Sequence, residues 1–171
     1  MIELDFKYLF EVNFEQFEYF LNSLDEEKES WSLDLQGFKD SKEMYDNSSN
    51  IPFVILCLDK DLVVGLVSVN LVSSNNIKND VEFRYFKNKN FENGTIISFV
   101  VKKEYQGKGI GTQLLIQMED VLKHLDFVKC DFIFAKHYKD NIASHKVFLK
   151  AGYKELPNNY DDNFNWKSKE L

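Results

Sequence analysis

Alternating and continuous apolar segments along the chain predict a set of β-strands. Residues 2–6 alternate between apolar and acidic positions, which is typical of a strand with one face toward a core. Two runs rich in Val, Ile and Leu are joined by Asp59-Lys60-Asp61, so we expect a β-hairpin there. Two later runs are apolar almost throughout, which favours strands buried on both faces. The expected strands are 2–6, 53–58, 62–69, 95–101, 131–135, 153–156 and 163–166.

Apolar residues at helical spacing predict three helices between these strands. The first follows Asn13, a suitable N-cap, and its aromatic stripe over 14–24 is expected to face the core rather than a cofactor. The second spans 110–125. The third begins after Asn141 and ends at Gly152, a residue favoured just past a helix C-terminus.

Two segments give weaker signals. Residues 31–50 are irregular, with a short helix expected near 38–46, and residues 73–94 are expected to form a long loop or a strand extension. No internal repeat or linker interrupts the chain, so we expect a single domain over 1–171. The strands and helices together predict an α/β (α+β) fold.

Composition narrows the class of protein. The chain has 171 residues, of which 44% are hydrophobic, enough for a sizeable core. No stretch reaches the roughly 18 apolar residues of a transmembrane helix, and residues 1–5 do not resemble a secretion signal. Cys57 and Cys130 lie in apolar stretches and are expected to be free thiols in a reducing compartment. We therefore expect a cytoplasmic protein that does not associate with membranes.

The charge is unevenly distributed. The net charge of −7 argues against nucleic acid as a partner, and Arg84 is the one arginine among 21 basic residues. Residues 1–50 hold 13 acids and 4 lysines, a net of −9, whereas residues 51–171 hold 15 acids and 17 bases, a net of +2. A solvated acidic face is the simplest interpretation.

A glycine-rich turn carries the clearest functional signal. Three of the seven glycines fall within 106–111 (Gln-Gly-Lys-Gly-Ile-Gly), between an apolar strand and an amphipathic helix. Unpaired amides at a helix N-terminus bind anions, phosphate above all, and Lys102, Lys103 and Lys108 add positive charge. The spacing fits neither a dinucleotide-binding G-x-G-x-x-G turn, where Thr112 replaces the third glycine, nor a P-loop. A tight turn without a ligand would not need three glycines.

The Q-x-x-G-x-G pattern at 106–111 resembles the Q/R-x-x-G-x-G/A pyrophosphate motif of the GNAT superfamily, the acetyl-CoA-dependent N-acyltransferases. Residues 101–111 are similar to that family's V-x-P-x-Y-R/Q-G-x-G-I-G, with Lys103 where Pro is common. Residues 141–153 are similar to its N-x-x-A/S-x-x-x-Y-x-K-x-G-F helix. The resemblance covers about 51–156, and it implies a mixed, mostly antiparallel sheet flanked by helices.

The resemblance implies a cofactor site for acetyl-CoA as cosubstrate. The parallel strands 95–101 and 131–135 would splay apart there, so that the backbone of the first pairs with the pantetheine arm. Phe148 stands where many members have a Tyr that protonates the departing thiolate. The cofactor-binding residues implied in this way are Phe99, Val100, Val101, Gln106, Gly107, Lys108, Gly109, Ile110, Gly111, Thr112, Asn141, Ser144 and Phe148.

The reaction that the resemblance implies needs a base, because a protonated amine cannot attack a thioester. His137 is the first choice and Tyr138 the second, since both follow the strand 131–135. Glu92, Glu104 and Asp140 are further candidates, whereas His124 and His145 are expected to face solvent, and no cluster has metal-ligand spacing.

The implied function is transfer of an acetyl group to a primary amine on a small molecule or peptide, by a monomer or homodimer. The acidic first third suggests that the amine acceptor is cationic. A non-catalytic acyl-CoA-binding or regulatory module is the alternative function. Phe148 supports this alternative, because it stands where many members have the proton-donating Tyr.

Overall fold

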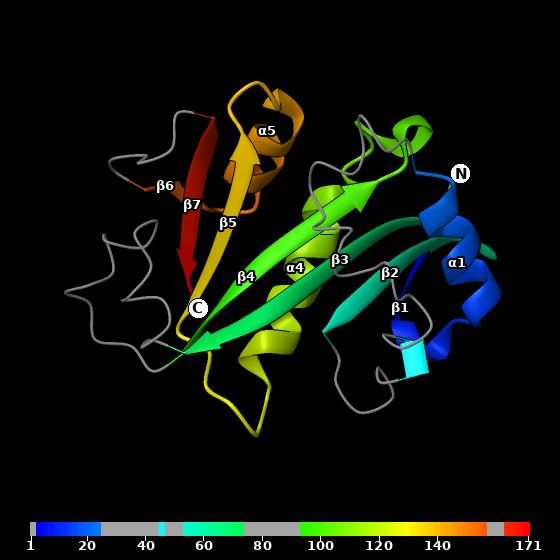
Figure 1. The fold of residues 1–171 in the computed structure, drawn as a ribbon, viewed down its shortest axis with the longest axis horizontal. Coiled ribbons are helices and arrows are strands. Elements are labelled where there is room, and N and C mark those ends of the chain that lie inside the picture. Colours follow the sequence, from blue (N-terminus) through cyan, green and yellow to red (C-terminus); the bar gives the residue numbers. More distant parts are fainter. Residues whose placement is uncertain (1–2, 25–44, 47–52, 74–92, 157–162) are drawn as a thin grey trace. The chain divides into compact units, whose positions relative to one another are not determined.

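The computed structural model describes residues 3–24, 45–46, 53–73, 93–156 and 163–171 (Figure 1). One sheet has the strand order β1-β2-β3-β4-β5-β7-β6. The strands are β1 Leu4–Tyr8, β2 Val54–Asp59, β3 Leu62–Ser73, β4 Asn93–Val101, β5 Phe132–Tyr138, β6 Lys154–Glu155 and β7 Phe164–Glu170. The helices are α1 Phe14–Asn22, α4 Ile110–Lys123 and α5 Ile142–Lys150, with 3-10 turns at Leu9–Glu11 and Lys103–Tyr105.

The predicted fold class is confirmed. The pairs β1–β2, β2–β3, β5–β7 and β6–β7 are antiparallel, and β4–β5 is parallel. Several strands are longer than predicted, among them β3, which continues beyond residue 69 to Ser73. β5 continues beyond residue 135 to Tyr138 and β7 beyond residue 166 to Glu170. Their ends carry Lys, His, Ser and Glu, and pairing between the strands stabilises these polar residues in extended conformation. The helix expected at 38–46 and the loop at 73–94 fall largely outside the described residues.

The chain divides into two compact units. Unit 1 comprises Met1–Ser68 and Ser98–Met118, and unit 2 comprises Val69–Ile97 and Glu119–Leu171. The single domain over 1–171 stays a prediction. Among the described residues, no helix is long and apolar enough to cross a membrane.

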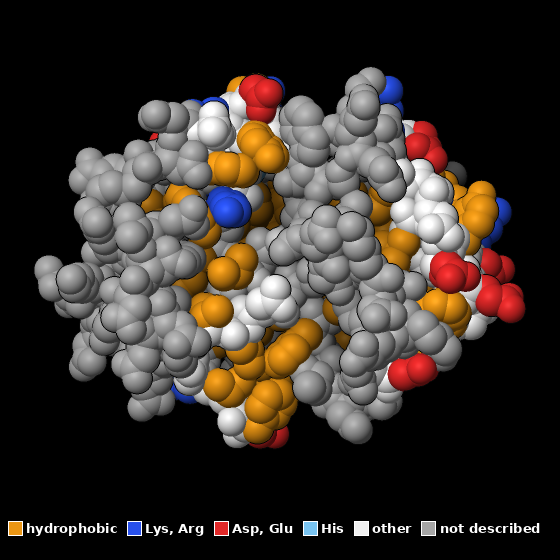
Figure 2. All heavy atoms as spheres, viewed as in Figure 1, with side chains coloured by type: hydrophobic (Ala, Val, Ile, Leu, Met, Phe, Trp, Pro, Cys, Tyr) orange, Lys and Arg blue, Asp and Glu red, His pale blue; other side chains and the backbone are white. Residues whose placement is uncertain are grey.

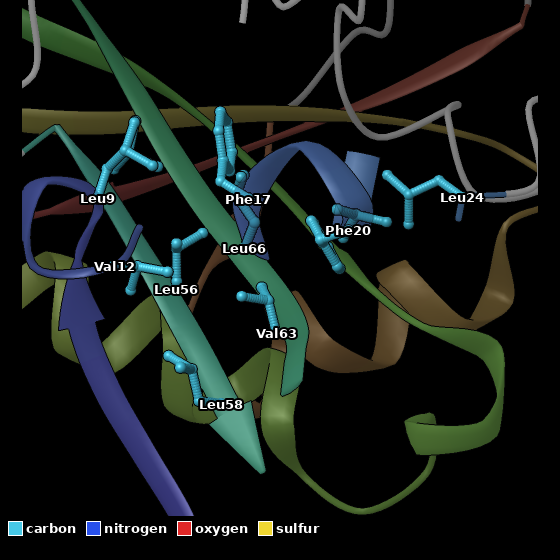
Figure 3. Close-up of a cluster of buried hydrophobic side chains, with 11 residues drawn as sticks. Leu9, Val12, Phe17, Phe20, Leu24, Leu56, Leu58, Val63 and Leu66 are labelled. Carbon is cyan, nitrogen blue, oxygen red and sulfur yellow. The ribbon is translucent and has the colours of Figure 1, made fainter. Parts of the chain in front are cut away.

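The core of unit 1 lies between α1 and the strands beside it (Figure 3). Phe17 and Phe20 are fully buried there, which confirms that the aromatic stripe faces a core. The side-chain oxygen of Asn13 accepts a hydrogen bond from the Gln16 amide, so the predicted N-cap is present. The other buried residues of this cluster are Leu9, Val12, Leu24, Val54, Leu56, Leu58, Val63, Leu66 and Val100.

The first turns of α4 pack on the face of the unit 1 strands that is opposite to α1. Neighbouring residues of a strand point to opposite faces, and Gly65 precedes Leu66 of the α1 cluster. A Cβ at Gly65 would lie 3.1 Å from Leu114 Cδ1 and 3.4 Å from Ile110 Cγ2. The missing side chain at Gly65 therefore allows α4 to approach β3 closely, and this contact fixes the helix end that follows the glycine-rich turn.

Candidate cofactor and active site

The connection from β4 to α4 in unit 1 is held by its own hydrogen bonds. The Lys102 amide donates to the Val64 carbonyl (2.9 Å), and the Tyr105 amide donates to the Lys102 carbonyl (2.8 Å). The Gln106 side chain then turns back, and its Nε2 donates to the carbonyl of Val101 at the end of β4 (3.0 Å). These bonds define the path of the chain into the glycine-rich turn.

Two glycines of that turn have backbone conformations that other residues rarely adopt. Gly107 has φ 75° and Gly109 has φ 84°. Within the described structure, nothing lies within 4 Å of the position that a Cβ would take at either residue. The turn is therefore open on the side of both glycines, as a cradle for a ligand requires.

The amides at the start of α4 complete this cradle. The Gln113 amide donates to the Gly109 carbonyl (3.1 Å), so the amides of Ile110, Gly111 and Thr112 precede the first helical hydrogen bond. Such amides, together with the helix dipole, favour an anion. The residues present thus fit a diphosphate, the group predicted to bind here.

The lysines near the turn have different surroundings. Lys108 is exposed, and its Nζ donates to the Glu104 carbonyl (2.8 Å). Lys102 is buried instead, with its Nζ 5.2 Å from the ring centroid of Tyr19 and 5.9 Å from that of Phe20. The ammonium group of Lys102 therefore packs on aromatic rings of α1, and its contribution to the charge at the turn stays a prediction.

The parallel pair of β4 and β5 has a short register. β4 and β5 pair at three positions, Gly94 with Phe132, Thr95 with Ile133 and Ile96 with Phe134. β4 continues to Val101 and β5 to Tyr138 beyond this pairing. The predicted splay of these strands at the cofactor stays a prediction. Phe99, Val100 and Val101, the residues predicted to meet the pantetheine arm, lie in the later part of β4 and are buried.

The second motif forms the start of α5 in unit 2. Asn141 is the N-cap, and its Oδ1 accepts from the Ser144 amide (3.0 Å). This bond engages the oxygen of the amide group, so the cap itself does not use the Nδ2 donor. Ser144 and Phe148 are buried, with exposed fractions of 7% and 3%.

His137 and Tyr138 lie on opposite faces of β5, because both belong to the strand. His137 lies against α5, with its ring stacked on Phe148 (centroids 6.1 Å apart) and edge-on to His145 (5.5 Å). Tyr138 packs instead on Phe164 of β7 (4.3 Å). The two predicted catalytic side chains therefore do not meet.

The environment of His137 fixes its protonation. The residue is 3% exposed, and burial lowers the pKa of its imidazole. Its Nδ1 is 2.8 Å from the Tyr138 carbonyl, an acceptor, so Nδ1 carries the proton of the neutral ring. The other nitrogen, Nε2, is buried and has no hydrogen-bond partner in the described structure. His137 therefore presents an unused lone pair, the state that a proton acceptor requires.

The other candidates have different surroundings. His124 is exposed, as predicted, but His145 is not fully solvent-facing, since its side chain is 29% exposed and contacts His137 and Glu155. That expectation was wrong because the end of β5 packs beneath α5. Glu104 and Asp140 are exposed, and Glu92 lies outside the described residues. Among the described residues, no group of three or more His, Cys, Asp or Glu could hold a metal ion.

Two partly buried ionic contacts in unit 2 have no clear signal in the sequence. Lys167 is fully buried and its Nζ lies 3.1 Å from Glu155 Oε1. Lys169 Nζ lies 2.6 Å from Glu119 Oε2 and also donates to the Ala151 carbonyl. Only the alternation of β7, which directs both lysines to the face that carries His137, could have indicated them.

Solved structures place the fold in a known class. The GNAT domain of the S. lividans protein PAT has a TM-score of 0.70 at 13% identity, covering 98% of this chain and 89% of that chain. The putative acetyltransferase yncA from Salmonella typhimurium, solved with acetyl-CoA, has a TM-score of 0.61 at 15% identity, covering 98% and 94%. NAA60 of Arabidopsis thaliana, in complex with acetyl-CoA, has a TM-score of 0.67 at 11% identity, covering 99% of both chains. The fold is that of GNAT acetyltransferases.

The sequence itself is similar to the acetyltransferase (GNAT) family over residues 9–153, and the chain belongs to this family. A curated relative, the uncharacterized N-acetyltransferase MJ1530 of Methanocaldococcus jannaschii, is 36% identical over 73 residues. That match covers 41% of this chain and 46% of the relative, so it spans less than half of either protein.

Proposed function

We propose that the protein transfers an acetyl group from acetyl-CoA to a primary amine. The observation that carries this proposal is the open glycine turn at the start of α4, where Gly107 and Gly109 have positive φ and no atom of the described structure occupies the space above them. Membership of the acetyltransferase family supports it. When bound, acetyl-CoA supplies the activated acyl group.

The chain's own groups would hold the cofactor in three places. Backbone amides from Gln106 to Thr112 would bind the pyrophosphate, and the backbone of Phe99, Val100 and Val101 would pair with the pantetheine arm. In unit 2, the Asn141 Nδ2 would donate to the same arm, beside Ser144 and Phe148. The Val101 carbonyl already accepts from Gln106 Nε2, so its second lone pair would serve the ligand.

The proton of the acceptor amine would pass to His137. The amine loses a proton, its nitrogen forms a bond to the acetyl carbon, the carbon–sulfur bond breaks, and the thiolate takes up a proton. A buried acceptor without a partner is unfavourable, and His137 Nε2 is such an atom. His137→Gln should lower kcat roughly 10²–10⁴-fold, whereas Tyr138→Phe, on the other face of β5, should have little effect. A large loss in Tyr138→Phe alone would assign the proton transfer to Tyr138.

The first experiment is ligand stabilisation by acetyl-CoA. A ligand at a hundredfold excess over Kd stabilises the folded state by about 2.7 kcal/mol, which raises the Tm. Gly109→Glu should abolish this increase, because a side chain with negative charge enters the cradle. Gln117→Glu adds the same charge at an exposed position of α4 and should keep the increase. An increase retained in Gly109→Glu would contradict the pyrophosphate site.

A non-catalytic acyl-CoA-binding module is the second candidate, and Phe148 favours it because phenylalanine has no proton to give. Release of free thiol across a panel of amines distinguishes the two functions. Acetyl-CoA binding without thiol release from any amine would support the module.

We infer that the acceptor is cationic, such as a polyamine, an aminoglycoside-like amine or a basic peptide terminus. Four acidic residues and one lysine lie between residues 4 and 22, and the acidic side chains over α1 are exposed in Figure 2. Such a surface attracts cations.

A further inference from the structure

We propose that Asp59 and Tyr105 are positioning residues that hold the glycine-rich turn in the conformation that binds pyrophosphate. The inference rests on the proposed cofactor site and adds to it a connection with the β2–β3 hairpin. All of its contacts lie within unit 1.

The connection is a hydrogen bond between distant parts of the sequence. The Tyr105 hydroxyl donates to Asp59 Oδ2 (2.9 Å), and the two residues are 46 positions apart. Asp59 is the last residue of β2, and Tyr105 ends the 3-10 turn that precedes Gln106. This charge-assisted bond raises the pKa of Tyr105, so its hydroxyl stays protonated and continues to donate.

The ring of Tyr105 in turn holds a lysine of the glycine-rich turn. Lys108 lies between the two glycines with positive φ, and its Nζ is 4.5 Å from the centroid of the Tyr105 ring. The same Nζ donates to the Glu104 carbonyl. Asp59 therefore fixes Tyr105, and Tyr105 fixes the ammonium group of Lys108 beside the open turn.

Electrostatic repulsion alone would make the Asp59 carboxylate weaken CoA binding, whereas a positioning role makes it strengthen binding. A carboxylate near a pyrophosphate repels it, so removal of that carboxylate would strengthen binding by simple electrostatics. A positioning role predicts weaker binding instead, since a turn without its support must be ordered when the ligand binds. The direction of the change thus separates the two effects.

The experiment compares two ligands by calorimetry: CoA, which has the pyrophosphate, and pantetheine, which lacks it. Tyr105→Phe keeps the ring and the charge but removes the hydroxyl, and we expect it to weaken CoA binding about tenfold, the effect of losing about 1.4 kcal/mol. Asp59→Ala should weaken CoA binding similarly, and the double variant should be no weaker than either single variant. Pantetheine affinity should not change. Asp61→Asn removes a nearby carboxylate of the same hairpin and serves as the matched control, with unchanged or slightly stronger CoA binding.

The role of Lys108 needs one further pair of variants. Tyr105→Leu removes the ring as well and should bind CoA more weakly than Tyr105→Phe. In a protein that also carries Lys108→Ala, Tyr105→Leu and Tyr105→Phe should bind CoA equally well, because the ring no longer holds an ammonium group.

Several outcomes would overturn the inference. They are unchanged CoA affinity in Tyr105→Phe, equal losses for CoA and pantetheine, or stronger CoA binding in Asp59→Ala. A wild-type protein that binds neither ligand would contradict the proposed function itself, which is a different result.

Discussion

His137 shows how one buried side chain determines a response to pH. Its ring contacts His145 on α5, and it interacts electrostatically with Glu155 on β6 and Lys167 on β7. Burial, Lys167 and His145 lower its pKa, and only the Tyr138 carbonyl and Glu155 oppose them. The folded protein therefore favours the neutral imidazole.

This lowered pKa predicts a loss of stability in mild acid. Above about pH 6.5, the pKa of an unperturbed histidine, both the folded and unfolded chains hold His137 neutral. Below it the unfolded chain takes up a proton that the folded chain does not, so the free energy of unfolding decreases until the folded pKa is passed. Urea unfolding between pH 7.5 and 5 should show a smaller decrease in His137→Gln than in the wild type.

The control for this prediction is His124→Gln, which removes an exposed histidine of α4. Its stability should follow the wild-type dependence on pH. Parallel curves for wild type and His137→Gln would contradict the assigned protonation.

Phe148 carries a separate prediction about the proton donor. Phe148→Tyr should change kcat by less than about threefold, because water can protonate the departing thiolate, whereas loss of a true general acid lowers kcat by roughly 10²–10⁴-fold. Phe148 is 3% exposed, so the added hydroxyl should also lower the free energy of unfolding, by about 1–3 kcal/mol if it finds no partner. Steady-state kinetics and urea unfolding measure both effects.

Phe148→Leu removes the ring without adding a hydroxyl and controls for altered packing. A large gain of kcat in Phe148→Tyr alone would favour the non-catalytic module as the native function.

At the scale of elements, the start of α5 combines a helix cap with a proposed ligand-binding side chain. The oxygen of Asn141 caps the helix, and the nitrogen of the same amide is the group that we propose binds the cofactor. An N-cap and a binding residue are therefore compatible roles of one side chain.

Two substitutions separate these roles. Asn141→Ala should lower the free energy of unfolding by about 1 kcal/mol through loss of the cap and should also weaken CoA binding. Asn141→Asp keeps a capping oxygen and adds a favourable negative charge at the helix N-terminus, so its stability should match the wild type. Its CoA affinity should nevertheless decrease, because the Nδ2 donor is gone. Wild-type CoA affinity in Asn141→Asp would make Asn141 a cap only.

At the scale of the whole molecule, the distribution of charge carries the prediction about the acceptor. Residues 1–50 have a net charge of −9 and the remainder a net of +2. If this asymmetry attracts the acceptor, the KM for a polyamine should increase with ionic strength, since the screening length is about 10 Å at 0.1 M salt. Glu15→Gln with Glu18→Gln, both exposed on α1, should raise that KM at low salt.

Glu170→Gln, at an exposed position of unit 2, is the matched control and should have a smaller effect. A KM that does not depend on salt, together with a preference for neutral amines, would leave the acidic residues as solvated surface.

Local patterns in the sequence were sufficient to predict the order of the described strands and helices and the position of the glycine-rich turn. Local signals are sufficient for these features: Asn13 and Asn141 accept bonds from amides three residues away, and glycine at 107 and 109 permits positive φ. The family resemblance added the prediction of a mixed sheet with one parallel pair, and the structure confirmed this sheet.

Tertiary structure alone decided which side chains meet. Pairing with β7 extended β5 to Tyr138, and this extension put His137 and Tyr138 on opposite faces. The buried Lys167, the packing of Lys102 on α1 and the bond from Tyr105 to Asp59 likewise join residues far apart in the chain. Such contacts depend on strand register and on packing between elements, and neither hydrophobic periodicity nor a short motif encodes them.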